Sequence, residues 1–187
     1  MTRSVIVVYV RQPADLVGQL VKKAQNGDRR AVGEIYELFL DRIFRFIRFR
    51  ISSTEDAEDV TQEVFMKMWR GLDNYRADGS PFEAWLYKIV RNSVIDYYRG
   101  QKPAVALDNA FQIADGKKSP EVAALQSIGK QEALLGLKKL KHSYQEIIIL
   151  KFIEDKDNRE ISAIIDKPVE HVRVLQSRAL KALRAVI

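Results

Sequence analysis

The chain has 187 residues, of which 47% are hydrophobic, and it contains no cysteine. This composition is typical of a globular protein with one ordinary domain or two small ones. The absence of cysteine excludes disulfides, a thiolate nucleophile and cysteine-ligated zinc or iron–sulfur clusters. The formal net charge is only +6, so the total charge allows a polyanionic partner without indicating one.

The longest apolar run, Val5 to Val10, lies in the first ten residues. It is far shorter than the roughly 20 residues needed to span a bilayer, and no small-residue cleavage site follows it. We therefore expect no membrane insertion and a cytoplasmic location. Residues 1–13 are expected to form an N-terminal extension, for which a flexible tail and a strand paired with a partner are both open.

Four helices are predicted in the first hundred residues. Their starts carry side chains typical of N-caps and capping boxes, and glycines follow two of their ends. These boundary residues are, in chain order, Asp15, Gly27, Asp28, Ser52 (with Glu55 as a capping box) or Ser53, Gly71, and Ser80 with Pro81 and Glu83. They place helices at about residues 15–26, 28–50, 52–70 and 81–99, with a polar loop before the last one.

Helical periodicity breaks after Gly100, and residues 101–127 are predicted to be an interdomain linker because prolines, glycine and lysines interrupt the pattern there. The linker separates an expected domain at residues 14–100 from one at residues 128–187. In the second domain the expected helix starts are Ser143 with Glu146, Asp157 with Glu160, and Pro168. The fold class is therefore predicted to be all-α, with two small helical domains.

One face of the third predicted helix is rich in carboxylates. Between Glu55 and Glu63 the chain has five acidic residues and no basic one, and at about 100° per residue most of them fall opposite the apolar stripe. Two interpretations stay open. The acids can form a solvated surface favoured near a helix N-terminus, or they can form a docking face for a basic partner protein.

The fourth predicted helix combines basic and aromatic side chains on one face. This face contains Tyr87, Lys88, Arg91, Ile95, Tyr98 and Arg99, with Trp85 and Asn92 at its border. Cations can hold phosphates and aromatic rings can stack on unpaired bases, a combination typical of surfaces that bind single-stranded nucleic acid. The alternative is that Trp85 and Tyr87 complete a small core.

The last two predicted helices have helix-turn-helix spacing, because a short helix ends at Asp166 and a longer one begins at Pro168. On the longer helix, Glu170, Arg173 and Ser177 could reach base edges, while Lys181 and Arg184 suit phosphates. Short helical hairpins also occur in proteins that never meet DNA, so the spacing alone does not settle the function.

Two segments, AEDVTQEVFMKMW (Ala57 to Trp69) and FEAWLYKIVRNSVIDYYRG (Phe82 to Gly100), closely resemble region 2 of bacterial extracytoplasmic-function (ECF) RNA polymerase sigma factors. The segment from Ala133 to Leu183 resembles their region 4. The resemblance implies a non-enzymatic protein, without cofactor or metal, that binds core RNA polymerase at the β′ clamp helices and the β flap. It also implies promoter DNA as a partner, transcription initiation as the function, and an anti-sigma factor as a candidate inhibitor.

The resemblance also implies three sets of contact residues. Core-polymerase docking is implied for Asp59, Gln62 and Glu63. Recognition and melting of the minus-ten element are implied for Asn74, Tyr75, Arg76, Trp85, Lys88, Arg91, Asn92 and Arg99. Recognition of the minus-thirty-five element is implied for Val169, Glu170, His171, Arg173, Ser177, Arg178 and Lys181. The turn from Asp166 to Pro168 replaces the usual glycine, hydrophobe and serine, so the minus-thirty-five sequence itself is not implied.

Two rival functions remain open at this stage. A helix-turn-helix regulator would bind duplex DNA without polymerase, and an adaptor would use only the acidic helix to hold another protein. An enzyme is the least supported class, because the chain has no glycine-rich phosphate loop and no cysteine. Neither His142 nor His171 has an identifiable catalytic partner in the sequence.

Overall fold

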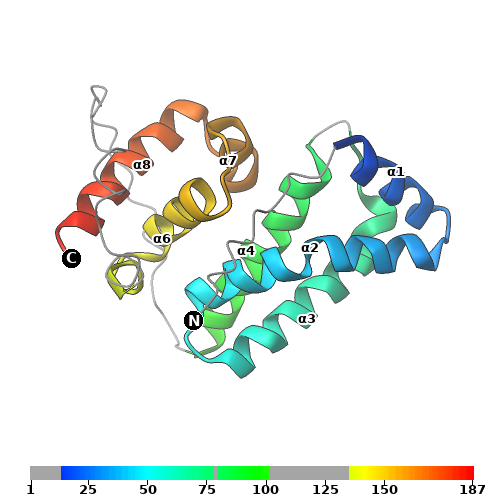
Figure 1. Ribbon diagram of the computed structural model, residues 1–187, viewed down its shortest axis with the longest axis horizontal. Helices are drawn as coiled ribbons and strands as arrows, with labels where there is room; N and C mark the ends of the chain where they lie inside the picture. Colours follow the sequence, from blue (N-terminus) through cyan, green and yellow to red (C-terminus); the bar gives the residue numbers. More distant parts are fainter. Residues whose placement is uncertain (1–13, 78–79, 102–134) are drawn as a thin grey trace, which may run out of the picture.

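The computed structural model describes residues 14–77, 80–101 and 135–187, and within these ranges the regular structure is helical. The helices form two groups (Figure 1). The N-terminal bundle comprises α1 (Ala14–Gln25), α2 (Arg29–Arg50), α3 (Thr54–Gly71), η1 (Leu72–Asn74) and α4 (Phe82–Gln101). The C-terminal unit comprises α6 (His142–Ile148), the π-helical turn η3 (Ile149–Ile153), α7 (Asn158–Ile165) and α8 (Val169–Arg184). The all-α prediction is confirmed.

The N-terminal bundle forms because each helix has one apolar stripe that needs a partner. On α2 the stripe recurs every three or four residues through Ile35, Phe39, Ile43 and Phe46, all 2% exposed or less. On α3 the expected apolar side is buried, including Val64 at 0%. The stripes of α2, α3 and α4 meet in one core. The acidic side of α3 is left exposed to solvent.

Helix starts confirm some of the predicted caps. Asp28 accepts hydrogen bonds from the backbone N–H groups of Arg30 (2.9 Å) and Ala31 (3.3 Å). Asp157 and Glu160 form the full capping box of α7, in which Asp157 accepts from the Glu160 N–H and donates its own N–H to Glu160 Oε2 at 2.7 Å. These caps satisfy backbone donors that have no partner within the helix.

Three predicted caps are wrong. α3 is capped by Ser53, the second of the two expected starts, which accepts from the Asp56 N–H at 3.1 Å, so the capping box of Ser52 with Glu55 is wrong. The Ser80 hydroxyl is buried and has no hydrogen-bond partner. No side chain caps α6, so Ser143 and Glu146 form no capping box there. Glu83 and Glu146 instead pair with basic side chains of other segments, because they face the contact between the two groups.

The C-terminal unit is built around a run of consecutive buried residues, Ile147 to Leu150. α8 packs its stripe of Val172, Leu175, Ala179 and Leu183 against this run and against α7. Asp166 ends α7 in the left-handed conformation (φ 56°), which an aspartate tolerates better than most residues. The turn between α7 and α8 therefore forms without the glycine that is usual there.

Two predictions fall outside the described residues. They are the N-terminal extension at residues 1–13 and almost all of the predicted linker at residues 101–127. The domain boundaries stay predictions for that reason. Within residues 14–77, 80–101 and 135–187, no helix has both the length and the apolarity that crossing a membrane requires.

Candidate polymerase and nucleic-acid interface

The acidic face of α3 is presented to solvent as the sequence predicts. Asp59, Gln62 and Glu63, the three residues implied in core-polymerase docking, are all exposed. Glu63 pairs with Lys67 one turn later, at 2.7 Å between Oε1 and Nζ, and Lys67 also donates a 3.1 Å hydrogen bond to Ser93 of α4. The charge of Glu63 is thus partly neutralised at the end of the face that meets α4.

Two exposed apolar residues continue this face, and the sequence reasoning missed them. Met66 is 53% exposed and Trp69 is 50% exposed. Together with Asp59 and Gln62 they recur at steps of three, four and three residues, which places all four within one narrow stripe of the helix. We call these four residues the α3 stripe. This spacing is that of coiled-coil contacts, so the stripe can pack along a partner helix. The signal in the sequence was two large hydrophobes lying opposite the buried stripe.

The loop between η1 and α4 forms a cleft with the first turns of α4. The cleft has a volume of about 270 Å³ and is lined by Asn74, Tyr75, Arg76, Ser80, Trp85 and Lys88. Five of these six residues are members of the predicted minus-ten set. The structure thus brings together in one cleft residues that come from two different segments of the chain.

Aromatic packing and hydrogen bonds give the cleft its shape. The rings of Tyr75, Phe82 and Trp85 lie 5.2–5.4 Å apart, and Tyr75 donates a 2.8 Å hydrogen bond to the Ser80 carbonyl. Gln25, the last residue of α1, donates from Nε2 to the carbonyls of Leu72 and Tyr75, both at 2.9 Å. The side-chain amide of Gln25 therefore fixes both ends of the turn that carries Asn74.

The cleft has the groups needed to hold an unpaired base. Trp85 is partly exposed and offers a ring for stacking, while Arg76 and Lys88 supply positive charge and Asn74 supplies an amide. Gly71 permits this arrangement, because a Cβ at that position would lie 3.1 Å from the Trp85 ring. Chemically, the site can bind and orient a base and its phosphate.

The remaining predicted residues of α4 divide between two environments. Asn92 and Arg99 are exposed, and Arg99 lies 3.9 Å from Asp96. Arg91 is half-buried and its Nε lies 3.1 Å and 3.2 Å from the two carboxylate oxygens of Glu146 in the C-terminal unit. Tyr87 is fully buried against Phe46, with ring centroids 5.5 Å apart. For Tyr87 the core interpretation is therefore right.

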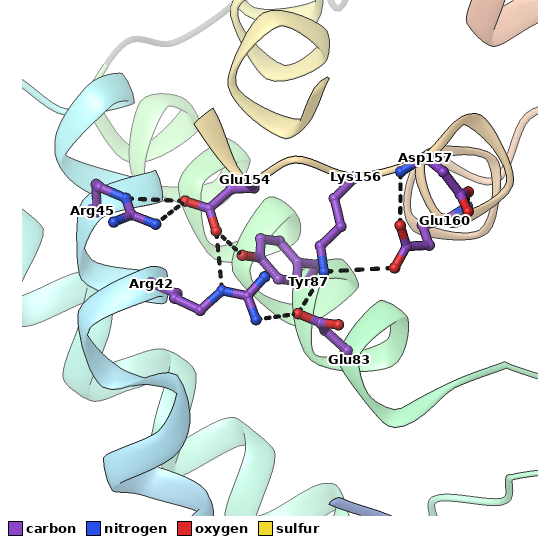
Figure 2. Close-up of polar contacts among 8 residues, drawn as sticks. All are labelled: Arg42, Arg45, Glu83, Tyr87, Glu154, Lys156, Asp157 and Glu160. Atoms are coloured by element: carbon purple, nitrogen blue, oxygen red, sulfur yellow. Dashed lines mark hydrogen bonds and ion pairs between the residues drawn. The ribbon is translucent and has the colours of Figure 1, made fainter. Parts of the chain in front are cut away.

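Tyr87 belongs to a buried polar network between the two groups of helices (Figure 2). Glu154, which follows η3, accepts from Tyr87 Oη at 2.8 Å, from Arg42 Nε at 3.2 Å and from Arg45 Nη2 at 2.8 Å. Glu83 Oε1 lies 2.7 Å from Arg42 Nη1 and 2.6 Å from Lys156 Nζ. In these residues the network joins α2 and α4 to the segment between η3 and α7.

Burial shifts the pKa values of this network. The pKa of Tyr87 is raised well above its ordinary value of 10, by burial and by the nearby Glu154 carboxylate. Burial lowers the pKa of Lys156, although Glu83 opposes that shift. Tyr87 consequently remains a neutral donor, and its hydroxyl proton is held by Glu154.

The helix-turn-helix pair presents a mixed surface on α8. Glu170, Arg173 and Lys181 are exposed, whereas Val169, His171, Ser177 and Arg178 are partly buried. Gln176 donates a 2.9 Å hydrogen bond to Asn158, and Ser162 donates a 2.6 Å hydrogen bond to the Lys167 carbonyl. These two bonds fix α8 and the turn against α7. Across the described ranges no three His, Cys, Asp or Glu side chains converge as metal ligands do.

Comparison with protein families matches both groups of helices. The family described as Sigma-70 region 2 matches residues 35–103, and Sigma-70, region 4 matches residues 136–185. The curated relative SigD of Mycobacterium tuberculosis, an ECF RNA polymerase sigma factor, is 31% identical over 173 residues, which cover 88% of this chain and 81% of SigD. BldN of Streptomyces coelicolor is 28% identical over 171 residues, 90% of this chain but only 65% of BldN.

Solved structures agree with these relatives. CnrH in complex with the cytosolic domain of CnrY matches with a TM-score of 0.69 at 26% identity, over 92% of this chain and 96% of that one. The sigma factor RpoE in complex with the anti-sigma factor NepR, from Bartonella quintana, matches with a TM-score of 0.62 at 25% identity, over 82% and 94%. With both family regions matched, this chain belongs to the ECF RNA polymerase sigma factors, non-catalytic proteins that direct transcription initiation through regions 2 and 4.

Proposed function

We propose that this sigma factor docks on core RNA polymerase through the α3 stripe and holds an extruded base of the minus-ten element in the cleft between η1 and α4. The single observation that carries the proposal is the cleft itself. It combines an accessible Trp85 ring with Arg76 and Lys88 at the end of the helix that bears the acidic face. Polymerase docking and promoter opening are thus assigned to two adjoining parts of one helical bundle.

Docking is argued from charge and shape. Asp59 and Gln62 supply a polar half of the α3 stripe, and Met66 and Trp69 supply an apolar half. A basic helix pair on the partner, such as the β′ clamp helices, fits such a stripe, because apolar anchors provide most of the affinity and charges provide orientation. The β flap would be contacted by the C-terminal unit. A protein that makes these contacts acts in the cytoplasm, where the polymerase works, so a cytoplasmic location is part of the proposal.

Promoter melting would result from preferential binding of an unstacked base over the closed duplex. Unstacking a base costs a few kcal/mol, and stacking on an aromatic side chain returns about 1–3 kcal/mol per base. Lys88 and Asn92 lie one turn apart on α4 and would follow the strand that leaves the cleft. A chain that holds the extruded base therefore shifts the duplex toward the open form without any covalent chemistry.

Recognition of the minus-thirty-five element is assigned to α8. Exposed Glu170 and Arg173 in its first turns can reach base edges in the major groove, while Lys181 suits a phosphate. An inhibitor that covers these surfaces is also part of the proposal. It is supported by the structural similarity to RpoE, which was solved with the anti-sigma factor NepR.

The test is transcription by purified core polymerase on a library of genomic templates, with and without this protein. New transcripts with defined start sites are expected only when the protein is present. Trp85→Ala and Lys88→Ala should lose open complexes while core binding is kept, and Asp155→Asn is a matched control at an exposed position of the C-terminal unit. No added transcript on any template, or tight specific duplex binding by the chain alone, would overturn the proposal in favour of a conventional regulator.

A further inference from the structure

Oxidisable sulfur in this chain is confined to three methionines. The sequence contains no cysteine, and its methionines are Met1, Met66 and Met68. A thioether is oxidised where an oxidant can reach its sulfur, so exposure to solvent decides which methionine reacts first. Met1 lies outside the described residues. The comparison is therefore between Met66 and Met68, which stand two residues apart on α3.

The two methionines of α3 lie on opposite sides of the helix. A step of two residues turns about 200° around an α-helix, and Met66 is accordingly 53% exposed whereas Met68 is 1% exposed. Met68 belongs to the hydrophobic core that also contains Val64 of the same helix. An oxidant in solution therefore reaches the thioether of Met66 and not that of Met68.

Met66 stands in the middle of the α3 stripe. Gln62 precedes it by four residues and Trp69 follows it by three, and both are exposed. Side chains at these spacings are neighbours on a helix surface. A partner helix that contacts both Gln62 and Trp69 must therefore cover Met66 between them.

Oxidation by hydrogen peroxide transfers one oxygen atom to the sulfur of Met66. The O–O bond of the peroxide breaks, the thioether loses two electrons and becomes a sulfoxide, and the peroxide is reduced to water. A methionine sulfoxide reductase reverses the change with two thiols, which become a disulfide while the oxygen leaves as water. This chain supplies only the thioether, so the step needs no catalytic group of its own.

The sulfoxide changes what Met66 can contribute to an interface. Oxidation turns a flexible apolar side chain into a polar one whose oxygen accepts hydrogen bonds. In the free chain this oxygen lies in water, so the fold is unaffected. Under a partner helix the oxygen is buried, and burying a polar group without a hydrogen bond weakens binding by about tenfold.

We propose that Met66 is a reversible oxidation site and that its sulfoxide lowers the affinity of this sigma factor for core RNA polymerase. Oxidation and docking oppose each other, because the free chain exposes the thioether and the complex covers it. Peroxide then reduces initiation by this sigma factor, and sulfoxide reductases restore it. This inference rests on the proposed function, whose polymerase contact it regulates.

The first test treats the free, full-length chain with hydrogen peroxide and removes the peroxide before untreated core polymerase is added. Peptide mass spectrometry should locate the added oxygen on Met66 and not on Met68. Affinity for core polymerase should fall by about tenfold, whereas the free energy of unfolding in urea should not change. Treatment with both methionine sulfoxide reductases, one for each sulfoxide epimer, should restore the affinity.

Variants assign the effect to one sulfur atom. The quantity compared is the ratio of core affinities before and after peroxide within each variant, so a change in starting affinity does not matter. Met66→Leu should show no loss on treatment, whereas Met68→Leu, the matched control in the core, should lose affinity as the wild-type chain does. Met66→Gln places a polar group at the same position and should bind core polymerase weakly without any peroxide.

The outcomes separate this inference from the proposed function. It is wrong if the chain carrying the Met66 sulfoxide binds core polymerase as tightly as the untreated chain, or if Met66→Leu loses affinity by the same factor as wild type. Peroxide added to the assembled holoenzyme should oxidise Met66 more slowly than in the free chain. Equal rates, with initiation intact, would also overturn the inference. Failure of the untreated chain to direct initiation would instead overturn the proposed function.

Discussion

Tyr87 of α4 donates a 2.8 Å hydrogen bond to Glu154, a residue 67 positions later in the chain. Both side chains are fully buried, and Phe46 and Lys156 enclose the tyrosine ring. The neutral Tyr87 hydroxyl thus donates to the Glu154 carboxylate, which also accepts hydrogen bonds from Arg42 and Arg45. The position of region 4 against region 2 consequently depends on a few polar atoms whose removal can be tested singly.

Tyr87→Phe removes only the donor and keeps the ring. Loss of a hydrogen bond to a buried carboxylate costs about 1.5–3 kcal/mol, so we expect a loss of that size in the free energy of unfolding, measured by urea denaturation. Energy transfer between dyes on cysteines introduced at two exposed positions, Glu34 in α2 and Ala185 after α8, should also fall, because the contact between the two units is weakened. Tyr97→Phe is the matched control, because Tyr97 donates to Asp56 within the N-terminal bundle at 2.7 Å. That variant should lose stability without a change in energy transfer.

Acidification should weaken the contact between the two units through His142. Burial and the nearby Arg50 lower the pKa of His142 from its ordinary value of 6.5, while Gln145 opposes the shift, and the imidazole stacks on Tyr98 at 4.3 Å. A histidine with a lowered pKa binds more protons when it is released, so the contact gains stability as pH rises through this range and loses it as pH falls below about 6.5. Energy transfer followed from pH 8 to pH 5, at approximate steps of half a unit, measures the effect.

His142→Gln cannot be protonated in this range and should flatten the profile. Its ring partner Tyr98 donates to the Arg50 carbonyl and remains neutral, because burial raises its pKa. A profile that stays as steep in the His142→Gln variant as in the wild-type chain would assign the pH dependence to another group.

Trp69→Ala should weaken binding to core polymerase by about 2 kcal/mol or more, as expected for a large aromatic anchor in an interface. Because Trp69 is half exposed in the free chain, its removal should change the free energy of unfolding by no more than about 0.5 kcal/mol. Fluorescence anisotropy with labelled sigma factor measures the affinity. Leu16→Ala, which truncates a 40% exposed apolar residue in α1, away from both proposed polymerase contacts, is the control. Equal effects of the two substitutions would count against an apolar half of the α3 stripe.

Gln25→Ala should loosen the cleft without touching its lining. The substitution removes both hydrogen bonds to the carbonyls of Leu72 and Tyr75, at an expected cost of about 1–3 kcal/mol in stability. Affinity for a single-stranded oligonucleotide should fall as well, because the turn that carries Asn74 is no longer fixed. Gln19→Ala on the exposed side of α1 is the control. Unchanged oligonucleotide binding in Gln25→Ala would show that the cleft does not depend on this brace.

Local patterns in the sequence predicted the elements well. The 3.6-residue period and the caps at Asp28 and Asp157 depend only on neighbours within a turn or two, so they can be read without the fold. The exposed acids of α3 and the buried stripe of α8 can likewise be read from local spacing in the sequence, without knowledge of the fold. The residues around the cleft were named by resemblance to the family, and their shared location follows from the contact of η1 with the start of α4.

The orientation of the long polar and aromatic side chains was decided by tertiary structure. The sequence places Tyr87, Arg91 and Tyr98 on one face with Lys88, and nothing in the helical period distinguishes a face that meets solvent from one that meets another domain. Glu83 and Glu146 stand at positions that favour helix caps, yet each pairs with basic groups across the interface, because a buried arginine or lysine needs a carboxylate more than an exposed N–H does.

The sequence by itself determined the helices, their apolar sides and the family, since these depend on short-range spacing and on motifs that are continuous in the chain. Only the tertiary structure decided that residues 42, 45, 50, 87 and 91 meet residues 146, 154 and 156. The physical reason is that ion pairs between distant segments leave no period in the sequence. Which charged residues pair can be seen only in the folded structure, where packing has removed water from both members of each pair.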